Sequence, residues 1–177
     1  MIVERIPVCA ISHKELKEME GTEREKLESH DCLIIIHDVA KMDELRYLKD
    51  NNILHLEFDD EDKPCKNSMN SSHARAITSW VKEQMTEGTN RIIVSCKGGS
   101  CRSAAIAFAI DLEINGYSNL WSDKSKLPNR LVFNLIREEG FTNRFTDEEI
   151  EQMFKLNRIG WDTEQKLKDM EDTEREK

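Results

Sequence analysis

The segment RIIVSCKGGSCRSAAIAFAI, residues 91–110, constrains the fold more than any other part of the chain. Its first five residues, 91–95, form an apolar run that is typical of a strand buried on both faces. The run ends in a turn with two glycines, and the apolar stretch that follows predicts a helix from near Arg102 to Gly116. A strand, a tight turn and a buried helix in this order indicate one unit of an α/β domain.

Three further apolar runs predict strands, and helical patterns lie between them; the runs cover residues 6–11, 32–38 and 53–58. Ser71 or Ser72 is suited to cap a helix that ends at Gly88. Pro128 suits the first turn of another helix. Strands that alternate with helices favour an α/β fold with a central, mostly parallel sheet flanked by helices.

The formal net charge is −9, with 38% apolar and 34% charged residues, which is typical of a soluble globular protein. This charge disfavours broad contact with DNA, RNA or an anionic membrane, and no segment reaches the ~18 apolar residues that a membrane helix needs. Five cysteines are an odd number, which favours free thiols, a reducing compartment and therefore the cytoplasm. We expect a monomer in which residues 1–160 form a single domain and the charged residues 161–177 form a frayed helix or a disordered tail.

The turn after the strand, residues 96–102, has the composition of an anion site, and we call it the anion loop. Gly98 and Gly99 let the backbone fold tightly with its N–H groups turned inward, and inward N–H groups at a helix N-terminus bind anions. Arg102 adds a guanidinium whose geometry matches two phosphate oxygens. The same positive environment favours the thiolate form of Cys96. A thiolate beneath a bound phosphate is a nucleophile aimed at phosphorus, so the loop predicts a phosphatase site.

Other interpretations of the anion loop explain less of it. The nucleotide-binding patterns GxxxxGK[ST] and GxGxxG are absent. Cys96 and Cys101 suit small buried apolar positions, but that interpretation gives Arg102 no role. Their spacing is not that of a metal-ligand pair, and no Cys/His cluster completes a site, so we expect no metal and no cofactor.

The segment VSCKGGSCRSAAIA, residues 94–107, resembles the signature of cysteine-dependent protein tyrosine phosphatases: Cys, five residues, Arg, then Ser or Thr. Its place in mid-chain, after a strand and before an apolar helix, with an aspartate-bearing loop upstream, is similar to the compact dual-specificity branch, particularly its small bacterial and phage-type members. The resemblance covers roughly residues 6–140 on motif order. The residue before the nucleophile is Ser95, where the family usually has His.

The resemblance implies a role for each residue of the segment. Cys96 would attack phosphorus and form a phosphocysteine, and Ser103 would donate a hydrogen bond to the departing thiolate. An aspartate would protonate the leaving oxygen and then activate water. The resemblance implies no metal. It also implies that the equatorial oxygens are bound by the Arg102 side chain and by the loop residues Lys97, Gly98, Gly99, Ser100, Cys101 and Arg102.

The acid loop, residues 59–62 with the sequence DDED, offers three candidates for that aspartate. The preceding strand ends at Phe58, and members of the family carry the acid just past that strand, which favours Asp60. Asp59 and Asp62 are the alternatives. A run of acids is also typical of a plain solvated turn.

The functional hypothesis is therefore a metal-independent phosphatase for phosphotyrosine, and for phosphoserine or phosphothreonine, in a protein or peptide. Three alternatives stay open: a catalytically inactive phosphate-binding protein, an RNA 5′-phosphatase, and a thiol redox protein that uses Cys96 and Cys101. Oxidation of Cys96 would give a sulfenic acid that a second thiol can trap. Cys101 and Cys65 are the candidates for this redox role, although a structural position is favoured for each: Cys101 as a small apolar core residue and Cys65 as a plain loop cysteine.

Overall fold

The computed structural model describes residues 5–21, 27–41, 44–48, 50, 52–142 and 144–175. Its sheet has four strands that are parallel throughout, in the order β1-β4-β2-β3. The α/β fold and the parallel sheet expected from the sequence are thus confirmed. The strands are β1 (Val8–Ser12), β2 (Asp31–His37), β3 (Ile53–Glu57) and β4 (Arg91–Cys96).

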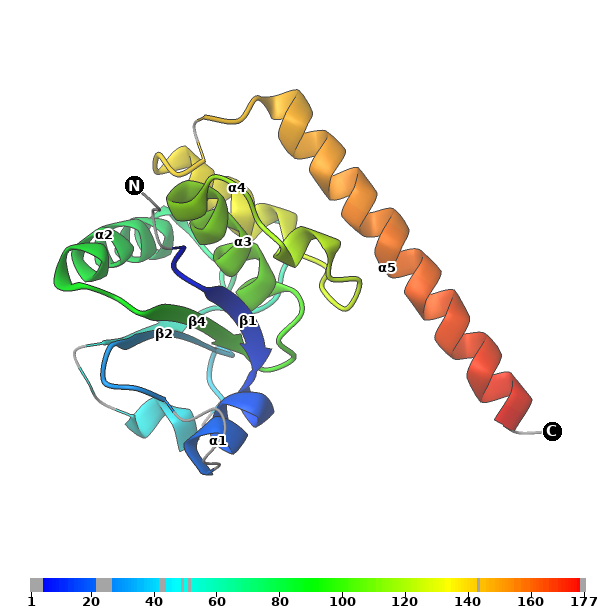
Figure 1. The fold of residues 1–177 in the computed structure, drawn as a ribbon, viewed down its shortest axis with the longest axis horizontal. Helices are drawn as coiled ribbons and strands as arrows, with labels where there is room; N and C mark the ends of the chain where they lie inside the picture. Colours follow the sequence, from blue (N-terminus) through cyan, green and yellow to red (C-terminus); the bar gives the residue numbers. More distant parts are fainter. Residues whose placement is uncertain are drawn as a thin grey trace.

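Helices cover both faces of the sheet and make three layers (Figure 1). Alternate side chains of each strand point to opposite faces, so the apolar residues of the strands divide between two clusters. One face carries α2 (Ser71–Glu87), α3 (Arg102–Asn115) and α4 (Arg130–Glu138). The other carries α1 (His13–Gly21) and the short 3-10 helix η1 (Glu44–Tyr47). A second 3-10 helix, η2 (Leu120–Ser122), follows α3.

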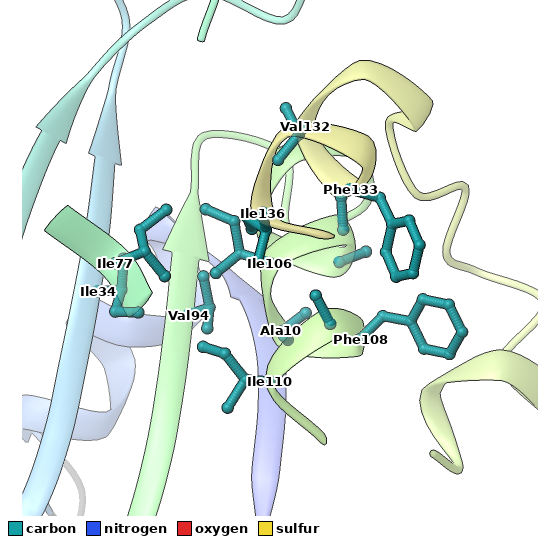
Figure 2. Close-up of a cluster of buried hydrophobic side chains, with 14 of the residues drawn as sticks. Ala10, Ile34, Ile77, Val94, Ile106, Phe108, Ile110, Val132, Phe133 and Ile136 are labelled. Carbon is teal, nitrogen blue, oxygen red and sulfur yellow. The ribbon is translucent and has the colours of Figure 1, made fainter. Parts of the chain in front are cut away.

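Helix α3 is the central helix of the larger cluster, and every residue from Arg102 to Leu112 is buried. An apolar surface all round a helix requires neighbours on all sides. Figure 2 shows Ile106 and Ile110 of α3 beside Val94 of β4, with Phe133 of α4 on the other side. This packing fixes the direction of α3, so its N-terminus points to the carboxyl end of β4.

The ends of two helices differ from the sequence-based expectation. Asn70, not Ser71 or Ser72, caps α2, because its side chain accepts hydrogen bonds from the amides of Ser72 and His73. Pro128 lies before α4 and not in its first turn, since Asn129 is the N-cap and accepts from the amide of Val132. Both caps are asparagines, whose short side chains reach the free amides of a first turn.

The last helix, α5 (Asp147–Arg175), is only partly packed against the domain. Ile150 is buried, and the Phe154 ring meets the Phe133 ring edge-on at 5.2 Å. Asn157 is also buried, and α5 contacts η2 and Lys124 near Gly160. The C-terminal part of α5 extends away from the body of the molecule (Figure 1). The helix runs without a break through residue 160, so the boundary between domain and tail stays a prediction. No helix in the described part of the chain is long and apolar enough to cross a membrane.

Candidate active site

The anion loop lies at the carboxyl end of β4, between β1 and β2, where parallel sheets bind ligands. Gly99 has a φ of +70°, and a Cβ at this position would collide with the backbone of Ile11 and Ser12. Only glycine combines this backbone conformation with so close an approach to β1. The loop is thereby folded back onto the sheet, with Lys97 and Gly98 exposed to solvent.

Cys96 is the last residue of β4, and only 2% of its surface is exposed. The Gly99 amide donates a hydrogen bond to the Cys96 sulfur at 3.3 Å. The Ser103 hydroxyl, which is fully buried in the first turn of α3, lies 3.1 Å from the same sulfur. A backbone amide, a hydroxyl that is able to donate and the N-terminus of α3 therefore meet at the sulfur.

Arg102 is 5% exposed, and two hydrogen bonds fix its guanidinium. Nη1 donates to the Phe58 carbonyl at 2.7 Å, and Nη2 donates to the Asp38 carboxylate at 2.7 Å. Its Nε is buried and has no hydrogen-bond partner within the described part of the chain. A guanidinium has five N–H donors, so Arg102 is held in place and still has donors for an anion.

One segment, residues 126–129, holds the outer side of the anion loop. Lys126 Nζ donates to the Gly99 carbonyl at 2.9 Å, and the Leu127 amide donates to the Ser100 carbonyl at 2.9 Å. The Asn129 amide donates to the Cys101 carbonyl at 3.2 Å. Three consecutive carbonyls are thus bound from outside, which preorganises the loop.

Asp60 is exposed, and its position is set by Asn129, whose Nδ2 donates to Asp60 Oδ1 at 2.8 Å. The same Nδ2 donates to the Glu61 carbonyl at 3.0 Å. Asp60 also lies against the anion loop. Burial raises the pKa of the Cys101 thiol to about 11, and the charge and a hydrogen bond of Asp60 add to this effect. Asn129 therefore connects the acid loop to the anion loop.

The other two aspartates of the acid loop have different surroundings. Asp59 Oδ1 accepts from the Val39 amide at 2.9 Å, and Asp59 Oδ2 accepts from Asn67 Nδ2 at 3.3 Å. Both oxygens are used to hold backbone and loop in place. Asp62, the last residue of the acid loop, is exposed. Asp60 is the one of the three for which an interaction with the anion loop is seen, through the Cys101 thiol.

The remaining predicted residues are Cys65, Cys101 and Ser95. Cys65 is exposed in a turn where its amide donates to Ser68 Oγ at 2.9 Å. Cys101 is half-buried beside Ser100. Ser95 Oγ is buried without a hydrogen-bond partner among the described residues, and by strand alternation it faces away from the Cys96 sulfur.

Asp38 and Asn129 are not among the site residues that the sequence predicts; Asn129, after Pro128, is typical of a structural turn. Burial raises the pKa of Asp38, but hydrogen bonds from Lys41 and Arg102 outweigh burial and hold it below its usual value. The sequence signal for Asp38 is its place directly after β2, the strand next to β4. For Asn129 the signal is an asparagine at a helix start, which is typical of an N-cap.

The described residues include no group of three or more His, Cys, Asp or Glu side chains placed to hold a metal ion. Fold and site together define an α/β protein with a cysteine–arginine anion loop at the carboxyl end of its sheet.

Comparisons with known proteins add the following. Neither the protein-family models nor the curated protein sequences contain a match to this chain. Among solved structures, the chain is similar to Tk-PTP in its active form, with 18% sequence identity and a TM-score of 0.37, over 88% of this chain and 89% of that one. It is also similar to PTPMT1, with 13% identity and a TM-score of 0.33, over 92% of each chain. Both neighbours are protein tyrosine phosphatases.

Proposed function

We propose that this chain is a cysteine-dependent protein phosphatase, a metal-independent phosphomonoester hydrolase that acts through a phosphocysteine. The observation that carries the proposal is the surroundings of the Cys96 sulfur. A backbone amide and the Ser103 hydroxyl point at it, and Arg102 is fixed in the same loop with a buried N–H that has no partner in the described chain. An aspartate, Asp60, lies against that loop. A nucleophile, an anion clamp and an acid are the three parts that phosphate-ester hydrolysis needs.

In the first step, Cys96 Sγ attacks phosphorus as a thiolate. The S–P bond forms while the bond between phosphorus and the ester oxygen breaks. Asp60, protonated, gives its proton to that oxygen, which leaves as a phenol or alcohol. Arg102 and the loop amides bind the three equatorial oxygens, whose charge is spread in the transition state.

In the second step, water attacks the phosphocysteine. Asp60, now a carboxylate, takes a proton from the water as its oxygen bonds to phosphorus. The S–P bond breaks, and the electron pair returns to sulfur as a thiolate. Ser103 Oγ, 3.1 Å from the sulfur, donates a hydrogen bond to that thiolate. Inorganic phosphate leaves, and the enzyme is as it was before the cycle.

The experiment that tests the proposal is hydrolysis of p-nitrophenyl phosphate by the purified chain in the presence of EDTA. We expect phosphate release at a rate that the chelator does not change, since thiolate, guanidinium and carboxylic acid supply the whole reaction. Activity that depends on an added divalent cation would assign the chain to another class of phosphatase. No activity on any aryl phosphate would contradict the proposal.

The substrate that we propose is a phosphorylated protein or peptide, with phosphotyrosine accepted and phosphoserine or phosphothreonine as further substrates, as in dual-specificity enzymes. A net charge of −9 supports a peptide over a polyanion such as RNA or an anionic membrane. Five free cysteines support the cytoplasm as the compartment, because thiols persist where the environment is reducing. We propose that the chain acts as a monomer.

A phosphate-binding protein without turnover is the second candidate, and Ser95 is the observation that favours it. Ser95 stands where the family that the loop resembles usually has His. Its buried hydroxyl has no partner among the described residues and faces away from the Cys96 sulfur, so it does not support the nucleophile. The two candidates differ in turnover and agree in anion binding. A chain that binds orthovanadate but hydrolyses no aryl phosphate is the phosphate-binding protein.

Redox control of the same site is a further prediction. Mild peroxide is expected to inactivate the chain by oxidising Cys96 to a sulfenic acid, and a thiol reductant to restore activity. A pKa of about 11 keeps Cys101 protonated, so it is a slow partner for a disulfide with Cys96. We expect Cys101→Ser to recover as wild type does. Peptide mapping identifies the disulfide partner of Cys96, and a Cys96–Cys101 disulfide would contradict this expectation. If Cys101→Ser and Cys65→Ser both recover activity as wild type does, neither thiol forms a disulfide with Cys96.

A further inference from the structure

The turn after β2, residues 38–41, lies between the anion loop and the acid loop, and we call it the Asp38 loop. Ala40 in this loop has a φ of +57°, in the left-handed region that side chains other than glycine and asparagine rarely adopt. Such a conformation persists only where surrounding contacts hold it, and it clusters at functional sites. The contacts that hold the Asp38 loop therefore indicate what its shape is needed for.

Arg46 of η1 supplies two of these contacts and binds the residue that supplies a third. Its Nε donates to the Lys41 carbonyl at 2.9 Å, and its Nη2 donates to the Asp38 carbonyl at 3.0 Å. Its Nη1 donates to Glu57 Oε2 at 3.0 Å, at the end of β3. Glu57 Oε1 in turn accepts from the Ala40 amide at 3.1 Å. One guanidinium and one carboxylate thus bind the Asp38 loop at its first, third and last residues.

The Asp38 loop contacts both halves of the proposed active site. The Asp38 carboxylate accepts from Arg102 Nη2 at 2.7 Å, and the pair is largely buried. The Val39 amide donates to Asp59 Oδ1 at 2.9 Å, and Asp59 directly precedes Asp60 in the acid loop. The position of the loop therefore sets both the arginine of the anion loop and the start of the acid loop.

We propose that Arg46 is a positioning residue for the anion site: it holds the Asp38 loop in the shape that places Arg102 and the acid loop on the phosphate. The inference rests on the proposed function for its catalytic part, and on anion binding alone for the rest. Arg46 acts through Asp38 and contacts no substrate. Its removal frees two carbonyls and one carboxylate, so Asp38 loses the fixed backbone that aims its carboxylate at Arg102.

The test is the affinity for orthovanadate, a tetrahedral oxyanion, measured by isothermal titration calorimetry on the full chain. Arg46→Ala is expected to weaken vanadate binding by about 10-fold, the scale of one misplaced charged hydrogen bond. It is also expected to lower kcat more for phenyl phosphate than for p-nitrophenyl phosphate, because the poorer leaving group depends on the acid loop.

Arg137 provides a matched control. Its side chain is 22% exposed against 23% for Arg46, and it likewise binds a carboxylate, of Asp147 at 2.6 Å, and a carbonyl, of Phe145 at 2.8 Å. These contacts join α4 to the start of α5 and involve neither loop of the site. Arg137→Ala is expected to lower Tm as Arg46→Ala does, with vanadate affinity unchanged.

Arg46→Lys is the conservative variant, and we expect it to recover only part of the affinity, since an ammonium cannot reproduce three fixed directions. If Arg46→Ala does not fold, the vanadate affinity of Arg46→Lys is the measurement that tests the inference. Wild-type vanadate affinity in Arg46→Ala and Arg46→Lys, or an equal loss in Arg137→Ala, would overturn the inference. A wild-type chain that binds vanadate without hydrolysing any ester overturns the proposed function instead, and leaves this binding test intact.

Discussion

Cys96→Ser is expected to abolish phosphatase activity, by roughly 10⁴-fold or more, while the chain still binds oxyanions. A hydroxyl is a weak nucleophile unless a base activates it, and the nearest hydrogen-bonding groups to Cys96 are the donors Ser103 and the Gly99 amide. Neither can take a proton from serine at neutral pH. The Arg102 guanidinium and the backbone amides of the anion loop, which bind the oxyanion, are unchanged, so orthovanadate binding should persist. Initial rates with p-nitrophenyl phosphate and calorimetry with orthovanadate measure the two effects separately.

Two further variants serve as controls for the separate effects of Cys96→Ser on turnover and on oxyanion binding. Cys65→Ser removes an exposed thiol outside the anion loop and should leave the rate unchanged. Arg102→Lys should weaken both turnover and vanadate binding, because a point charge cannot replace the fork that binds two oxygens. It also removes the hydrogen bonds that Arg102 donates to the Phe58 carbonyl and to Asp38 Oδ1. Substantial turnover by Cys96→Ser would exclude the phosphocysteine mechanism.

Asp60→Asn is expected to slow the hydrolysis of phosphotyrosine and phenyl phosphate by ~10² to 10⁴-fold, the usual contribution of acid–base catalysis. Asn129 Nδ2 donates to Asp60 Oδ1 at 2.8 Å, and an asparagine oxygen can accept the same bond. The variant therefore keeps the side chain in place and removes only its ability to transfer a proton. The defect should be much smaller for p-nitrophenyl phosphate, whose leaving group needs less protonation.

The control is Asp62→Asn, an exposed acid two residues further along the same loop, which should leave the rate unchanged. Asp59→Asn alters a residue whose carboxylate accepts from Val39 and Asn67, so its main effect should be a lower Tm. The leaving-group dependence of the rate, measured over a series of aryl phosphates, assigns the acid. If the rate of Asp60→Asn depended on the leaving group as that of wild type does, while the rate of Asp62→Asn fell steeply for poor leaving groups, the role would move to Asp62. A wild-type dependence in all three variants would favour the phosphate-binding protein.

The strand, the turn and the buried helix at residues 91–115 are the part of the fold that the sequence predicts best. Each has a local cause: β-branched residues in β4, glycines in the anion loop, and an apolar surface all round α3. The contacts of Cys96 with Ser103 and Gly99 follow from this local order, because the three residues lie close together in the sequence, in the anion loop and the first turn of α3. Helix ends were predicted less well, as Asn70 and Asn129 show, since several neighbouring residues suit the same cap.

The choice among the three acids of the acid loop could not come from the chain alone. Asp59, Asp60 and Asp62 have the same functional group, and although the end of the strand at Phe58 favours Asp60, the sequence does not show what each carboxylate contacts. In the structure Asn129 binds Asp60, while Val39 binds Asp59. The difference depends on which side chains meet across loops that are far apart in sequence.

By itself, then, the sequence determined an α/β domain with a thiol, two glycines and an arginine in one turn between β4 and α3. Those features depend on neighbouring residues, whose conformational preferences act locally. Only the tertiary structure decided the partners of the turn: Asp38, 64 residues from Arg102, and Asn129, 69 residues from Asp60. The physical reason is the parallel sheet, which brings the carboxyl ends of its strands to one edge and places there side chains that no sequence spacing relates.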